Sequence, residues 1–190
     1  MRELRAGVWH WHAPHPEWEP GHGWDEIVSS YAIDDGERLL VFDPLALPAE
    51  LEELAGEREA AIVLTSPWHV RDAAVLAERL GAALYVPSPD EGVDGLHYLP
   101  GDRLPVGVET FPGMEPNEAA VWVEGCRAVV LGDAVIDRGS GLELPSDWLE
   151  SKSVEQIRAD LRPLLDLPVE LVLPTHGEPT DKAALARALA

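Results

Sequence analysis

Short apolar runs separated by turn residues set the pattern of this chain. Residues 39–42, 62–64 and 171–173 are brief, apolar and partly β-branched, which predicts buried strands. Residues 48–56 and 69–80 instead carry helix formers with apolar residues on one side, which predicts short helices. Because strands and helices alternate through the first half, we expect a parallel or mixed sheet covered by helices.

The second half continues with strand signals and ends in two helices. Further strands are predicted at residues 106–111, 119–123 and 128–131. Ser153 and Gln156 have the spacing of a capping box, which predicts a helix beginning there. A last helix is expected from about residue 181, with Thr180 as its N-terminal cap.

Composition narrows the kind of protein that this pattern builds. The length suits one domain, and we expect residues 1–190 to form it. A formal charge of −21 argues against nucleic acid and anionic membrane surfaces as partners, because both bind basic footprints. With no membrane-length apolar run or signal segment, we expect a cytoplasmic protein that binds a small molecule. Cys126, the one cysteine, excludes an internal disulfide and a cysteine-based zinc cluster.

The N-terminal segment 1–27 is rich in histidine and tryptophan. Residues 8–12 alternate, so a strand there places its two tryptophans on one face and His10 and His12 on the other. A loop-like stretch with His15 and His22 follows. We expect this segment to pack as a strand and a lid. Its histidines are either polar tips of that lid or, for His10 or His12, part of a ligand or metal pocket.

Five polar residues stand at or near the ends of predicted buried strands. They are Asp43, His69, Asp72, Asp133 and His176. His69 and Asp72 are expected on the first turn of one helix, three residues apart and on one face. Strand ends of a layered α/β fold converge at one edge of the sheet, where chemistry is usually placed. Histidine and carboxylate are also the nitrogen and oxygen ligands of zinc, manganese and iron, so a metal-binding cleft is a candidate.

The order of these segments resembles the metallo-β-lactamase fold over roughly residues 29–177. Residues 41–44 look like the strand and Asp before that family's first helix, and residues 62–72 look like its histidine-rich motif segment. The remaining matches are Phe111-Pro112-Gly113-Met114, Leu131-Gly132-Asp133 and Pro174-Thr175-His176-Gly177, which look like the family's later ligand segments. The resemblance implies a single-domain, four-layer αββα sandwich of the α/β (α+β) class.

The family's metal ligands are largely replaced in this sequence. Its expected ligand positions hold Ser66, Trp68, Val70, Arg71 and Met114. Asp133 and His176 stand where the family has ligands, and a shift of one or two residues in the motif loop offers His69 and Asp72 instead. We therefore take His69, Asp72, Asp133 and His176 as candidate metal ligands, and His69, Asp133 and His176 as candidate catalytic residues.

Three hypotheses follow for this site. It is a retired site in which Trp68 and Met114 fill the space and Arg71 pairs with Asp133. It is a mononuclear centre holding one zinc, manganese or iron ion. Or it performs acid–base chemistry without a metal, using His176 or His69 with Asp133. If active, the protein is expected to be a hydrolase of ester, thioester or amide-type bonds; the alternative is a non-catalytic ligand-binding protein.

Overall fold

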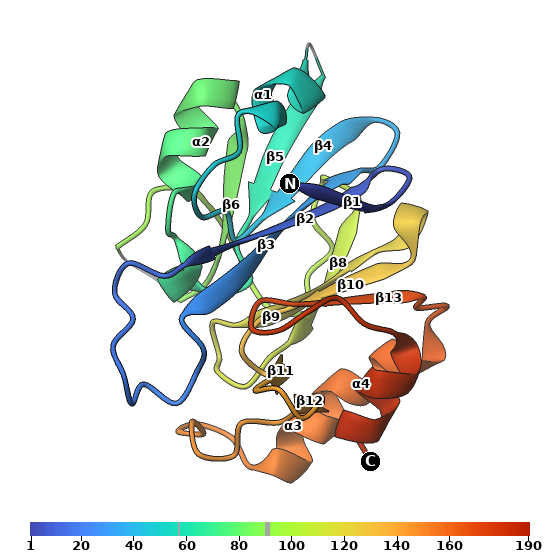
Figure 1. Cartoon of the computed structure of the whole chain (residues 1–190). Helices are drawn as coiled ribbons and strands as arrows, with labels where there is room; N and C mark the ends of the chain where they lie inside the picture. Colours follow the sequence, from blue (N-terminus) through green and yellow to red (C-terminus); the bar gives the residue numbers. More distant parts are fainter. Residues whose placement is uncertain (57, 90–91) are drawn as a thin grey trace.

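The computed structural model describes residues 1–56, 58–89 and 92–190. Two β-sheets lie face to face, and helices cover the outer side of each sheet, as Figure 1 shows. The α+β class and the αββα layering expected from the resemblance are confirmed. Among the helices described, none has the length and apolar content needed to cross a membrane.

The first sheet has seven strands whose order in space is their order in sequence. They are β1 (Arg2–Arg5), β2 (Val8–Pro14), β3 (Ile27–Asp34), β4 (Arg38–Phe42), β5 (Glu59–Val63), β6 (Ala83–Pro87) and β7 (Leu96–Tyr98). Strands β1 to β4 pair antiparallel, and β4 to β7 pair parallel. The predicted mixed sheet is thus present, although β1 and β7 were not predicted.

The second sheet has the order β13-β10-β9-β8, in which only β10 and β13 run parallel. Its strands are β8 (Val108–Pro112), β9 (Ala119–Val123), β10 (Ala128–Leu131) and β13 (Leu171–Pro174). The short hairpin β11 (Ile136–Asp137) and β12 (Leu142–Glu143) follows β10. The helices are α1 (Glu50–Ala55), α2 (Ala73–Leu80), α3 (Val154–Leu161) and α4 (Lys182–Ala188), with 3-10 turns η1 (Pro67–His69), η2 (Glu124–Cys126) and η3 (Arg162–Asp166).

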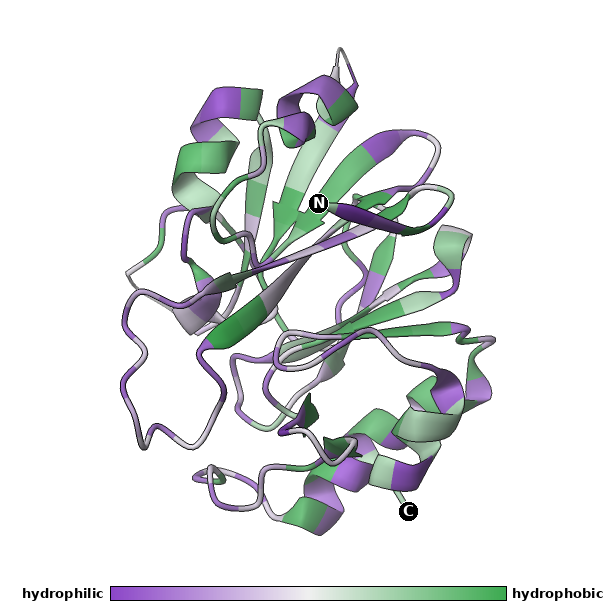
Figure 2. Cartoon of the chain, in the orientation of Figure 1, coloured by the Kyte–Doolittle hydropathy of each residue, from purple (hydrophilic) through white to green (hydrophobic). Residues whose placement is uncertain are grey.

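Apolar side chains fill all three spaces between the layers. Between the sheets, Phe42 and Val63 of the first sheet belong to the same buried cluster as Val121 and Val130 of the second. One further cluster lies under α1 and α2, and another under α3 and α4. Figure 2 shows the same arrangement, with green strands between more mixed helices. Burial of this apolar surface is the main force that holds the layers together.

The helix caps agree with the sequence at one helix and correct it at another. Ser153 and Gln156 form the expected capping box at the start of α3. For α4 the cap is Asp181, whose carboxylate accepts a hydrogen bond from the Ala184 amide, and the expected cap at Thr180 is wrong. Thr180 instead forms a β-bridge with Val172, so its carbonyl accepts a hydrogen bond from the Val172 amide and not from the first turn of the helix.

The segment between β5 and α2 also differs from expectation. His69 ends the 3-10 turn η1, whereas Asp72 is the N-cap residue of α2. Arg71 lies between them with a φ of 37°, a left-handed value that interrupts any continuous helix. The expectation that His69 and Asp72 share the first turn of one helix is therefore wrong, and their side chains need not point the same way.

Candidate functional site

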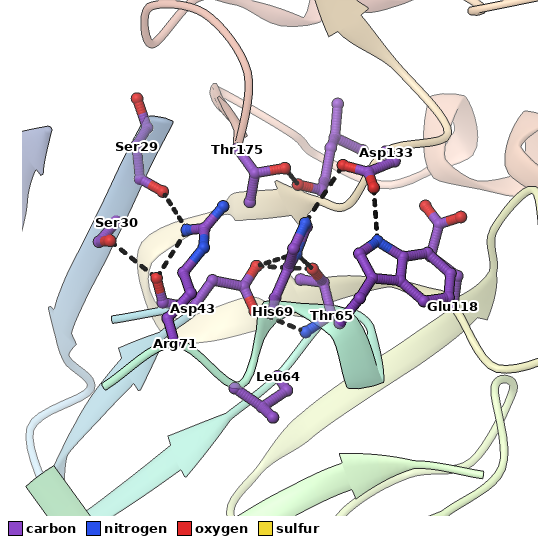
Figure 3. Close-up of polar contacts among 12 residues, drawn as sticks. Ser29, Ser30, Asp43, Leu64, Thr65, His69, Arg71, Glu118, Asp133 and Thr175 are labelled. Carbon is purple, nitrogen blue, oxygen red and sulfur yellow. Dashed lines mark hydrogen bonds and ion pairs between the residues drawn. The ribbon is translucent and has the colours of Figure 1, made fainter. Parts of the chain in front are cut away.

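The candidate site lies where strands of both sheets end. Asp43 directly follows β4 and Thr65 lies just beyond β5 in the first sheet, while Asp133 and His176 follow β10 and β13 in the second. Strands β4 and β5 run parallel to each other, as do β10 and β13, so within each pair the carboxyl ends meet at one edge. The η1 turn adds His69 at this edge, and Figure 3 shows Asp43, Thr65, His69 and Asp133 gathered there.

Three of the candidate ligands point at one another. Nε2 of His69 and Nε2 of His176 each lie 3.3 Å from Oδ1 of Asp133. One ligand atom from each of the three residues lies within 4.8 Å of the others, and all three side chains are buried. Among the residues described, this is the group whose donor atoms are spaced to hold one metal ion.

The spacing suits a metal ion better than hydrogen bonds. Two ligands each about 2.0–2.1 Å from a zinc ion at a tetrahedral angle lie about 3.3 Å apart. Oδ1 of Asp133 is buried, and no described residue forms a hydrogen bond of acceptable geometry to it; the same holds for Nδ1 of His176. A buried carboxylate oxygen without a hydrogen bond is costly, and a cation placed between the three atoms would remove that cost.

The far side of the His69 ring is held by a buried chain of hydrogen bonds. The Thr65 hydroxyl lies 3.0 Å from Nδ1 of His69 and donates to Oδ2 of Asp43 at 2.6 Å. Because that hydroxyl proton is already given to Asp43, the Thr65 oxygen accepts from Nδ1–H of His69. Nε2 of a neutral ring then carries the lone pair that faces Asp133, as a metal ligand requires.

Without a metal, a proton takes the place between these groups. Burial lowers the pKa of the His69 imidazole, but the charges of Asp133 and Asp43 outweigh it and raise that pKa to about 9. Burial also raises the pKa of the Asp133 carboxyl, yet the adjacent His69 and His176 bring it well below its usual range. The metal-free site is thus an imidazolium between two carboxylates, and a metal must displace that proton.

Trp68 forms a hydrogen bond with the second carboxylate oxygen of Asp133. Its indole Nε1–H donates to Oδ2 of Asp133 at 2.6 Å, so only Oδ1 faces the two histidines. In the retired-site hypothesis, Trp68 and Met114 fill the space between the ligands. Trp68 instead is 44% exposed at the rim, and Met114 is buried in the cluster beneath α3 and α4.

Asp72 and Arg71 take other roles than expected. The carboxylate of Asp72 accepts a hydrogen bond from the amide of Ala46 at 2.7 Å and is not in the group of three ligand residues. The structure therefore does not bring Asp72 to the metal group, because Asp72 begins α2 instead of facing the cleft. Arg71 donates to the carbonyl oxygens of Ser29 and Asp43, and no described ion pair joins it to Asp133.

The N-terminal histidines divide between the core and the cleft. His10 is buried, and its Nε2 lies 2.9 Å from the Ser29 hydroxyl, which donates onward to the carbonyl of Gly177. The rings of His10 and His12 lie 5.7 Å apart, on the face of β2 expected from the alternation. Neither lines the cavity at the metal group, which instead receives His15 and His22 from the loop between β2 and β3.

That cavity has a volume of about 300 Å³ and is lined by residues from both halves of the chain. Its lining comprises His15, Glu17, His22, Trp24, Trp68, His69, Arg71, Asp133, Trp148 and His176. Trp24 and Trp148 both pack edge-on against the ring of His176, with ring centroids 5.2 and 5.9 Å away. Trp24 belongs to the long loop between β2 and β3, which Figure 1 draws in blue.

Sequence reasoning missed two buried polar residues behind the site. Thr65 links His69 to Asp43, and its place just beyond a buried strand was an available signal. Glu118 is fully buried and accepts hydrogen bonds from the amides of Ala134 and Met114. Burial and the charge of Asp133 raise the pKa of Glu118 to about 8. Its sequence context is that of an ordinary turn residue, so no signal marked it.

Comparisons with known proteins bear on this geometry. No family model matches the sequence, and no curated protein does. Among solved structures, TTHA1623 in a di-iron-bound form is 26% identical over 85% of this chain and 93% of that one, with a TM-score of 0.64. ETHE1 from Myxococcus xanthus is 21% identical over 85% and 78%, with a TM-score of 0.63. A metallo-β-lactamase from Erythrobacter litoralis is 13% identical over 99% and 89%, with a TM-score of 0.72.

These likenesses show the class of fold. The chain has the metallo-β-lactamase fold over nearly its whole length, as its segment order suggested. His69, Asp133 and His176 therefore form a candidate metal-binding group at the edge of a fold whose relatives include a protein solved with two iron ions.

Proposed function

We propose that this protein is a hydrolase that uses a single divalent metal ion held by His69, Asp133 and His176. The observation that carries the proposal is the 3.3 Å spacing of both histidine nitrogens from a carboxylate oxygen that lacks a hydrogen bond. Two histidines, one carboxylate and an open position are typical of mononuclear catalytic centres. Zinc is the first choice, with manganese and iron as alternatives.

The replaced residues support one metal over two. Trp68 stands at a position where the resemblance implies a histidine ligand, and its indole N–H holds the second oxygen of Asp133. That oxygen is then not free to bind a second ion, and Met114 offers only a weak thioether near the remaining family position. Within the described part of the chain, the site keeps a ligand group for one ion.

Each residue of the site has a separate task in this reaction. A bound divalent metal supplies a Lewis acid, which polarises a carbonyl oxygen and lowers the pKa of water to about 7. Asp43 and Thr65 orient His69, and Trp68 orients Asp133. The neighbouring Trp24 and Trp148 hold the His176 ring and border the cavity where a small substrate would lie. Esters, thioesters and amides are the proposed substrate class, because water attack on a carbonyl suits this chemistry.

A pair of carboxylate variants tests the proposal. Metal-loaded protein should hydrolyse one or more p-nitrophenyl esters or thioesters, and Asp133→Asn should lower the rate more than about a hundredfold, beyond the effect of outer-shell changes. Asp72→Asn is the matched control, because Asp72 is a nearby carboxylate outside the group, and its rate should stay within about twofold. Hydrolysis that survives both Asp133→Asn and chelation would contradict the proposal.

The second candidate is a metal-free ligand-binding protein on the same fold. The observation in its favour is the His69 imidazolium, which pairs with both Asp43 and Asp133 and so can complete the site without a metal. This candidate predicts no thermal stabilisation when zinc, manganese or iron is added. The hydrolase predicts a rise in Tm with metal concentration, since the ion binds the folded chain.

A further inference from the structure

The cavity above the metal group combines apolar walls with a polar end. Its volume of about 300 Å³ is at the lower end of the usual range for small-molecule sites. Trp24 and Trp148 line it from loops of the two halves of the chain, and Trp68 lines it from η1. Tryptophan rings are large apolar surfaces, so an occupant would place an apolar or planar body against them.

Arg71 brings an incompletely bonded guanidinium to this cavity. Its Nη1 donates to the carbonyl oxygens of Ser29 at 3.2 Å and Asp43 at 2.9 Å. Its Nε is buried without a partner, and no described residue accepts a hydrogen bond from Nη2. Figure 3 shows this second terminal nitrogen turned away from both carbonyls, toward the side of His69 and Asp133. A partly desolvated cation with free donors is stabilised by an anionic partner.

His15 adds a donor from the loop between β2 and β3. Its Nδ1 accepts a hydrogen bond from the amide of Glu17 at 3.3 Å. Burial and the charge of Arg71 lower the pKa of His15, so the ring is neutral near pH 7 and carries its hydrogen on Nε2. His22 repeats the arrangement, because its Nδ1 accepts from the amide of Glu19. With the Nδ1 lone pair engaged, each ring offers an N–H donor rather than a metal ligand.

From these donors we infer that the cavity binds small molecules that carry one carboxylate on an apolar or aromatic body. Arg71 binds the carboxylate, His15 donates a second hydrogen bond, and Trp24 and Trp148 enclose the body. Glu17, the acidic side chain at the rim, disfavours a second negative charge on the ligand. Binding of such a molecule does not depend on the proposed function. That the molecule is also the substrate rests on the proposed function, and the hydrolase would then act on esters, thioesters or amides that carry a carboxylate.

Three probes of nearly equal size separate charge from shape. Phenylacetate, phenylacetamide and 2-phenylethylammonium share an aromatic ring and differ in charge. Their affinities are measured by calorimetry on chelator-treated wild-type protein, so that no metal can bind the carboxylate. Phenylacetate should bind at least about tenfold more tightly than the amide, as charge-assisted hydrogen bonds predict. Equal affinities, or tighter binding of the ammonium, would overturn the inference.

Substitutions assign the preference to its residues. Arg71→Gln should remove the preference for phenylacetate, and Arg71→Lys should keep part of it, because lysine retains the charge without the planar fork. Since Arg71 also holds two carbonyls, His15→Ala serves as a second variant that leaves those hydrogen bonds intact. It should reduce the preference by about threefold. Arg103→Gln is the control, because Arg103 pairs with Glu109 on the exposed surface. A full preference in both Arg71→Gln and His15→Ala would overturn the inference.

The inference and the hydrolase proposal fail in different ways. Binding of phenylacetate is measured without metal and without turnover, so its loss in wild-type protein counts against the carboxylate site alone. Metal-loaded protein is then compared on p-nitrophenyl butyrate and mono-p-nitrophenyl glutarate, a neutral and an anionic ester. The glutarate should have the higher kcat/KM, by about tenfold, and Arg71→Gln should equalise the two. Probe preference without hydrolysis of either ester would reject the hydrolase and leave the binding site in place.

Discussion

The two sides of the site present their candidate ligands in different ways. On the side of the second sheet, Asp133 and His176 lie two residues beyond the ends of β10 and β13, where the resemblance places ligands. On the side of the first sheet, all the ligand positions that the resemblance implies are replaced, and His69 reaches the group from the η1 turn; on the other side, only the position at Met114, after β8, is replaced. The retained side relies on strand ends, whereas the rebuilt side relies on a buried hydrogen-bond chain.

The difference is visible in the two histidine rings. Nδ1 of His176 has no hydrogen-bond partner in the described part of the chain, and edge-on contacts of Trp24 and Trp148 hold this ring. Nδ1 of His69 lies 3.0 Å from the Thr65 hydroxyl and 3.3 Å from Asp43. A histidine on a turn needs these hydrogen bonds to fix the orientation of its ring. We therefore expect substitutions at Asp43 to lower metal affinity more than substitutions around His176.

The largest effect short of removing a ligand is expected from Asp43→Asn. The amide replaces one carboxylate oxygen, so either the Thr65 amide or the Thr65 hydroxyl loses its acceptor. We expect a loss of about 1–3 kcal/mol in the free energy of unfolding, measured with urea. Metal affinity should fall about 10–100-fold, because the orientation and basicity of His69 depend on this carboxylate.

Asp72→Asn is the matched control for Asp43→Asn. Asp72 bonds the Ala46 amide and does not contact His69, so its variant should keep the wild-type metal affinity. Equal losses of affinity in both variants would mean that the buried chain has no special role in placing His69.

A smaller effect is expected from Trp68→Phe. The phenyl ring keeps most of the apolar surface but removes the N–H that holds Oδ2 of Asp133. Metal affinity should fall about tenfold, measured by competition with a chromophoric chelator, because the carboxylate is then free to rotate. Trp11→Phe removes a comparable indole hydrogen bond, to the Leu45 carbonyl, away from the site and should leave metal affinity unchanged. Unchanged metal affinity in Trp68→Phe would show that the indole N–H does not orient Asp133 for metal binding.

The last prediction concerns folding stability and the hydrogen bonds behind His176. His10 bonds Ser29, which bonds the carbonyl of Gly177 next to His176. Burial lowers the pKa of His10 from 6.5 to about 4 in the folded chain. The unfolded chain therefore binds more protons as pH falls below 6.5, and folding stability decreases through that window.

His10→Gln tests this contribution. Between about pH 7 and pH 5, His10 should account for at most about 2 kcal/mol of lost stability in metal-free protein. Glutamine keeps a donor for Ser29 but does not titrate, so urea unfolding of the variant should depend less steeply on pH in that range. A slope as steep as that of the wild type would assign the loss to other groups.

The fold could be predicted further than the site. Buried strands are short apolar runs that sequence reveals directly, and polar residues at their ends marked Asp133, His176 and His69. Edge strands β1 and β7 were missed because they have four and three residues, which is too short to show the alternation of a strand. The left-handed backbone at Arg71 has no sequence signal, because such a conformation is uncommon outside glycine, and it separates the turn that carries His69 from the helix that Asp72 begins.

The surroundings of the site depend on contacts between distant segments. Trp24 and Trp148 meet at His176 although 124 positions separate them in sequence. The pairing of Trp68 with Asp133 likewise spans 65 positions. Composition indicated that the tryptophan-rich N-terminal loop covers something, but only the assembled layers determine which side chains it faces.

We propose that the site holds one metal ion on His69, Asp133 and His176. The most direct test is elemental mass spectrometry of protein purified without chelator or histidine tag, alongside His176→Ala. We expect one equivalent of zinc, manganese or iron per chain in the wild type and none in the variant. Two equivalents, none after incubation with each metal, or one that persists in His176→Ala would contradict it.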